Sequence, residues 1–74
     1  MDKLDLHYTR HHLVRPMLIR FTEDHWGREV DAEIITGNSN TMKDLVKEVL
    51  DEYKLNYTDG SFDGVNLGFI RVEI

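Results

Sequence analysis

The chain has 74 residues, enough for one domain with a small hydrophobic core, and we expect residues 1–74 to fold as a single unit. It contains no cysteine, which excludes disulfides and thiolate-bound metals as sources of stability. No apolar run approaches the roughly 18 residues of a membrane span. Met1 is followed by charged residues rather than by a signal peptide, so we expect a cytoplasmic protein with no membrane partner.

The net charge of −5 argues against a protein that coats nucleic acid generally. The charge is uneven, however. Residues 1–22 carry four basic and two acidic side chains, whereas residues 23–74 carry five basic and twelve acidic ones. Three of the four histidines lie in the basic part, which predicts a local anion-binding edge on an acidic body.

The first predicted strand covers residues 4–8, where apolar and polar side chains alternate and place Asp5 and His7 on one face. A helix follows, with Thr9 as a candidate N-cap and Gly27 as the stop. Its apolar stripe, which we expect to be core, consists of Leu13, Val14, Met17, Leu18 and Phe21. Pro16 predicts either a bend or a helix that begins only near Leu13.

A second strand is predicted over residues 30–36, followed by a polar turn that opens a helix over residues 42–53. Thr41 and Asp44 have the spacing of a capping box, and Lys43 falls on the solvated face of this helix. Two further strands, over residues 55–62 and 68–74, are joined by a hairpin turn at residues 63–64.

This element order, β-α-β-α-β-β, predicts an α+β two-layer sandwich. Right-handed crossovers make the first three strands parallel, and the short last connection makes the fourth strand antiparallel to the third. Two amphipathic helices are enough to cover one face of the sheet. The other face is left open to water or to a protein partner.

Three short motifs resemble the Smr (small MutS-related) domain family. They are LDLH at residues 4–7, ITG at residues 35–37, and N-x-G followed by a terminal V-x-I at residues 66–74. The chain departs from the family pattern at three positions. Ser39 stands where the second signature ends in glycine, Asn38 where a basic residue is common, and Tyr8 where a glycine commonly follows LDLH.

The resemblance implies the fold of the C-terminal domain of translation initiation factor 3, with a mixed sheet of order 1-2-4-3 and both helices on one face. It also implies nucleic-acid binding and, in some members, endonuclease activity as DNA nicking or RNA cleavage. Carried over by position, Asp5 and His7 are the catalytic candidates. Thr36 and Gly37 are the candidate turn that binds the nucleic-acid backbone.

Neighbouring parallel strands would bring these motifs to one sheet edge, beside the positive end of the second helix. The full set of candidate nucleic-acid-binding residues is Arg10, His11, His12, Arg15, Thr36, Gly37, Asn38, Ser39, Asn40 and Lys43.

Two mechanisms are open. His7 could act as general base or acid, with Asp5 orienting its ring. Alternatively, Asp5 and Glu33 could hold Mg²⁺ or Mn²⁺ to activate water, although no metal-specific spacing is present and no cofactor is certain. Two other functions stay open beside a nuclease: a module that binds nucleic acid or a protein without cleavage, and an interaction domain with no nucleic-acid role.

Overall fold

The computed structural model describes residues 2–74 and contains four strands and two helices. In chain order these are β1 (Asp2–Asp5), α1 (His11–His25), β2 (Asp31–Ile35), α2 (Asn40–Glu52), β3 (Asn56–Phe62) and β4 (Val65–Glu73). No helix in this part of the chain is long and apolar enough to cross a bilayer.

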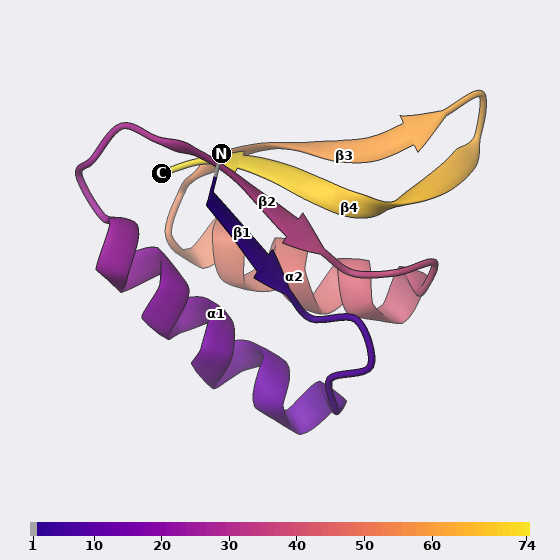
Figure 1. Ribbon diagram of the computed structural model, residues 1–74, viewed down its shortest axis with the longest axis horizontal. Coiled ribbons are helices and arrows are strands. Elements are labelled where there is room, and N and C mark those ends of the chain that lie inside the picture. Colours follow the sequence, from indigo (N-terminus) through magenta and orange to yellow (C-terminus); the bar gives the residue numbers. More distant parts are fainter. Residues whose placement is uncertain (1) are drawn as a thin grey trace.

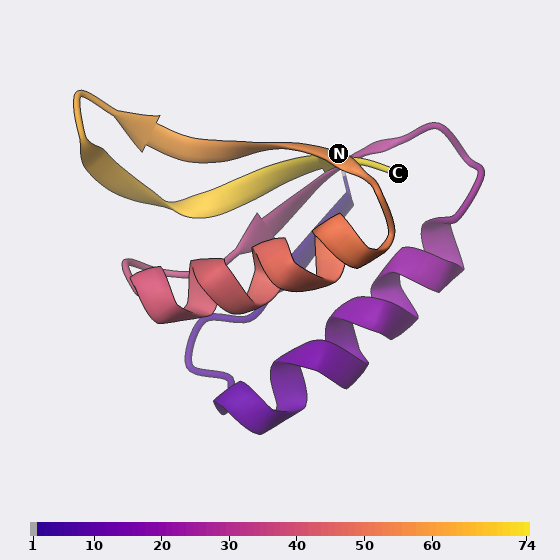
Figure 2. The same cartoon turned by 180° about the vertical axis from the view of Figure 1, so that it is seen from behind.

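The strands form one mixed sheet in the order β1-β2-β4-β3, as predicted. β1 pairs parallel with β2, and β4 pairs antiparallel with both β2 and β3. Both helices lie on the same side of the sheet, which leaves the other face uncovered (Figure 1). The view from behind shows the same two layers and the β3–β4 hairpin reaching past the start of α2 (Figure 2). The α+β two-layer sandwich is therefore confirmed.

The core lies between the sheet and the helices. Alternation along the strands places Ala32 and Ile34 of β2 and Ile70 and Val72 of β4 on the helix side, and all four are fully buried. The helices contribute Val14, Leu18, Val46, Val49 and Leu50 to the same cluster. Burial of these side chains, at about 25 cal/mol per Å² of apolar surface, is the main stabilising contribution in a chain without disulfides.

Helix α1 differs from its prediction in its start and in its buried stripe. It begins at His11, after Arg10 rather than Thr9, and continues through Pro16, whose side chain is exposed on the solvent side. The prediction that Leu13 and Met17 belong to the core is wrong, because they are 43% and 37% exposed. β1 is an edge strand, so no further strand covers the outer flank of α1 on which Met17 lies beside Leu4.

Helix α2 differs in its cap and in its polar face. Its N-cap is Ser39, whose side-chain oxygen accepts a hydrogen bond of 3.1 Å from the amide of Met42, so the predicted capping box at Thr41 is wrong. Lys43 is also not solvated: it is 3% exposed, and its ammonium donates to the carboxylate of Asp59 and to the carbonyl oxygen of Gly60. The local sequence could not predict this contact, because the acceptors Asp59 and Gly60 lie on β3, which is remote from Lys43 in the chain.

The β3–β4 hairpin turns at Asp63 and Gly64 as predicted, and the register of the two strands shifts between Gly60 and Ser61. Glycine is required at position 60, because a Cβ atom there would lie 2.6 Å from the backbone carbonyl oxygen of Phe69 and 2.7 Å from its ring atoms. Phe69 therefore packs flat across its neighbour strand on the open face of the sheet.

Candidate functional site

The candidate site begins where β1 ends. The amide of Leu6 makes the last ladder bond, to the carbonyl oxygen of Ile35, and the chain then turns so that the amide of Thr9 bonds the carbonyl oxygen of Leu6. His7 therefore lies in a turn and not on the strand, which corrects the prediction that the strand extends to residue 8. The carboxylate of Asp5 fixes this turn by accepting a 2.9 Å hydrogen bond from the backbone amide of His7.

Tyr8 occupies the third position of this turn with φ of +68°, a value that favours glycine or asparagine. The ring of Tyr8 is stacked on the imidazole of His7 with centroids 3.8 Å apart, and Tyr8 is 92% exposed. The imidazole thus has an aromatic neighbour from the same turn.

The ring of His7 also packs against Gly37, the second residue after β2. A Cβ atom on Gly37 would lie only 2.7 Å from Cδ2 of His7 and 3.3 Å from Nε2. Gly37 has φ of +68°, so its backbone takes a conformation that side chains rarely adopt. Glycine at this position allows the imidazole to lie directly on the backbone.

β4 closes the site from the other side. The carbonyl oxygen of Gly68 accepts hydrogen bonds from the amides of Thr36 and Gly37, at 2.8 and 3.0 Å. Asn66 supports this arrangement, because its side chain accepts from the amide of Gly68 at 2.7 Å and donates to Asn40 at 3.3 Å. The ITG motif therefore contacts both LDLH and N-x-G at this end of the sheet.

These contacts change the expected roles of several residues. Within the described residues 2–74, Asp5 bonds the backbone of His7 and not its imidazole, so Asp5 positions the turn. Thr36 is 2% exposed, its hydroxyl donates to the carbonyl oxygen of Gly37, and its amide is occupied by Gly68, so it supports the turn from inside. Lys43, buried against Asp59, lies outside the accessible surface of the site.

The cationic candidates are divided between two places. Arg10, His11 and His12 are exposed at the start of α1. Arg15 instead forms an ion pair with Glu52 of α2, and this hydrogen bond together with the charge of Glu52 raises the pKa of the guanidinium. The charge of Arg15 is therefore partly compensated by a neighbour on the helix layer.

The start of α2 supplies the remaining polar groups. Asn38, Ser39 and Asn40 are exposed, and Asn40 and Thr41 begin the helix. The first amides of a helix have no intrahelical acceptor, so those of Asn40 and Thr41 can donate to an external oxygen. The start of the second helix was the expected phosphate position, whereas the amides of Thr36 and Gly37 in the expected backbone-binding turn already donate to Gly68.

A metal site is not built into this edge. Among the described residues, no three carboxylate or imidazole side chains gather closely enough to hold an ion. Glu33, the expected partner of Asp5, stands in register with Lys3 across β1 and β2. Asp5 pairs with Ile35, two residues further along the ladder, so the carboxylates of Asp5 and Glu33 do not stand directly opposite each other.

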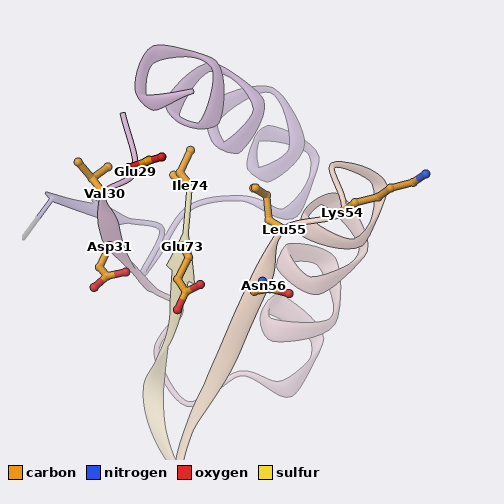
Figure 3. Close-up of a pocket in the computed structure, with 8 residues that line it drawn as sticks. All are labelled: Glu29, Val30, Asp31, Lys54, Leu55, Asn56, Glu73 and Ile74. Atoms are coloured by element: carbon orange, nitrogen blue, oxygen red, sulfur yellow. The ribbon is translucent and has the colours of Figure 1, made fainter. Parts of the chain in front are cut away.

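The opposite end of the sheet has a different chemistry. The pocket drawn in Figure 3 lies between the start of β2, the end of β4 and the start of β3. Asp31, Glu73 and Asn56 line its polar side, and Asp31 and Glu73 stand directly opposite each other in the β2–β4 register. Because adjacent carboxylates repel phosphate, this end is the less favourable one for an anionic ligand.

Two contributors to the site escaped the candidate set. Asn66 and Gly68 were recognised as part of the motif pattern, yet nothing local in the sequence indicated that they contact the second motif. Only the pairing of β4 with β2 places them there.

Comparison of the chain with known family models, with characterised proteins and with solved structures found no match.

Proposed function

We propose that this protein is a nucleic-acid-binding domain of the Smr type, with His7 as the residue that can carry out phosphodiester cleavage. One observation carries the proposal: the imidazole of His7 lies on the backbone of Gly37, whose amide bonds Gly68. Three motifs that resemble one family are far apart in sequence, and their contact in space is what a shared site requires.

The chemistry of the edge supports a phosphodiester as ligand. The unpaired amides at the start of α2 suit a phosphate oxygen. Arg10, His11 and His12 are exposed on the segment that leaves the turn. An imidazole can take a proton from an attacking hydroxyl or give one to a leaving oxygen. Asp5 contributes by holding the turn that carries the imidazole.

The test compares wild type with His7→Ala on structured RNA and on supercoiled DNA, with and without Mg²⁺ or Mn²⁺. We expect binding that weakens as salt rises, since phosphate contacts release counterions. Cleavage that is present in wild type and lost in His7→Ala supports an enzyme, whereas binding without cleavage supports a non-catalytic module. His25→Gln is the control, because it removes an imidazole at the far end of α1. Absence of both binding and cleavage in wild type would refute the proposal.

A protein partner on the open sheet face is the second candidate. It is favoured by Val65 and Leu67 of β4, which are 59% and 52% exposed, and by the net charge of −5. Phe69 and Arg71 continue this strip, with the guanidinium 5.9 Å from the ring centroid. Substitution of Leu67 by Ser should abolish such an interaction and leave oligonucleotide binding unchanged.

A further inference from the structure

Tyr8 is the most unusual residue of the candidate site. It combines a left-handed backbone, an almost fully exposed aromatic ring and a stacking contact with His7. An exposed ring gains little from folding, and its φ of +68° costs free energy that glycine would not. Residues with such strained backbones cluster at binding and active sites, so we infer a role in binding for Tyr8.

We propose that Tyr8 is a stacking platform for an unpaired nucleobase, which makes single-stranded nucleic acid the ligand of this site. This inference rests on the proposed function. The ring already lies face to face with the imidazole, with 27° between the planes, so a base on its outer face would extend the same stack. The sugar and phosphate attached to that base would then lie close to His7.

The charge of the protein favours the same ligand. A duplex offers its phosphates but hides the faces of its bases, so duplex binding depends on a broad cationic surface. This chain has a net charge of −5 and an acidic pocket at the opposite end of the sheet. Single strands expose base faces, and stacking on an aromatic side chain contributes to affinity without positive charge.

The same geometry predicts the form of recognition. Stacking uses the face common to all bases, so sequence preference should be weak, with purines favoured by their larger rings. DNA and RNA share this chemistry at the base. A ribose hydroxyl near His7 would distinguish them, and the test therefore includes both.

The experiment measures fluorescence anisotropy of short labelled oligonucleotides: single-stranded DNA, single-stranded RNA, and the matching blunt duplex. We expect wild type to bind the single strands more tightly than the duplex. Tyr8→Gly and Tyr8→Leu should each weaken single-strand binding by at least about fivefold, while Tyr8→Phe and Tyr8→Trp should stay within about twofold of wild type. Leucine supplies apolar surface but no aromatic face, so weak single-strand binding by Tyr8→Leu would indicate that the base stacks on the ring.

Two features keep the test interpretable. Tyr8→Gly places at φ +68° the residue that conformation favours, so its loss of binding cannot be assigned to unfolding. Trp26→Leu is the matched control, because Trp26 is another exposed aromatic residue, 56% exposed, at the far end of α1. It should bind as wild type does.

The outcomes separate this inference from the proposed function. If Tyr8→Gly binds single strands as tightly as wild type, or more tightly, the stacking platform is refuted and the proposed nucleic-acid site stands. Tighter binding to the duplex than to either single strand also overturns it. Failure of wild type to bind any oligonucleotide overturns the proposed function together with the inference. Upfield shifts of the Tyr8 ring protons on addition of a single strand, absent with the duplex, would locate the stack directly.

Discussion

Gly37→Ala is the sharpest perturbation of the site, because the added methyl group would meet the imidazole of His7 at 2.7 Å. At φ of +68° the left-handed backbone costs an L-residue about 1–2 kcal/mol. The reduced freedom of the unfolded chain returns about 0.4–1 kcal/mol. We therefore expect a net loss of about 1 kcal/mol in the free energy of unfolding, or ~4–8 °C in melting temperature for a domain of this size.

The steric contact should add little to that loss. The atoms to be displaced belong to an exposed ring, which can rotate away from the new methyl group. Gly64→Ala is the matched control, since Gly64 has φ of +78° and nothing within 4 Å of its Cβ position. Both variants should lose similar stability in urea unfolding, while only Gly37→Ala should shift the His7 ring resonances and reduce nucleic-acid binding to the level of His7→Ala. Unchanged His7 resonances in Gly37→Ala would refute the contact.

Ser39→Ala should reduce the free energy of unfolding by about 1 kcal/mol through loss of the N-cap bond, whereas Thr41→Ala should change it by less than about 0.5 kcal/mol; equal losses in urea unfolding would contradict the assignment of the cap. Hydrogen bonds from Lys43 and then Lys47 lower the pKa of Asp59 below its ordinary 3.8, so its contribution to stability is present above that pH and lost as the pH falls through the lower folded-state value. Asp59→Asn should reduce the fall in stability at acid pH and lower the free energy of unfolding by ~2 kcal/mol at neutral pH, because the buried ammonium of Lys43 loses its counter-charge. An acid titration followed by circular dichroism that is unchanged in Asp59→Asn would exclude the ion pair. Asp5→Ala should speed hydrogen exchange of the His7 amide, while Asp5→Asn retains an acceptor and should protect it; equal exchange in the two variants would mean that Asp5 does not hold the turn.

Periodicity explains why the fold was predictable. The face that meets the core is indicated by the alternation in residues 31–35 and 70–74 and by the apolar positions of α2. The lengths of the connections then restrict the strand directions. These signals are local. The order 1-2-4-3 came from the resemblance to a family, because nothing in the spacing of β3 and β4 states which of them pairs with β2.

Two of the wrong predictions concern what lies opposite a side chain in the fold, which a local pattern does not state. Lys43 has the position of a solvated helix residue, and only the placement of β3 turns it into a buried cation beside Asp59. Leu13 and Met17 have helical spacing suited to a core, yet no strand lies beyond β1 to cover them. Patterns along the chain report which way a side chain points and not what it meets there.

The sheet order is also what creates the site. β2 lies between β1 and β4, so the segments that leave its end meet the turn after β1 on one side and Gly68 on the other. Three backbones approach closely at this point, and a Cβ atom on Gly68 would lie 3.4 Å from the Cα atom of Gly37. That distance is an ordinary contact, so what favours glycine at position 68 is its φ of +83°, whereas at position 37 both the φ of +68° and the imidazole of His7 favour it. A fold with β3 in the place of β4 would keep the contact of His7 with Gly37 and lose the hydrogen bonds from Thr36 and Gly37 to Gly68.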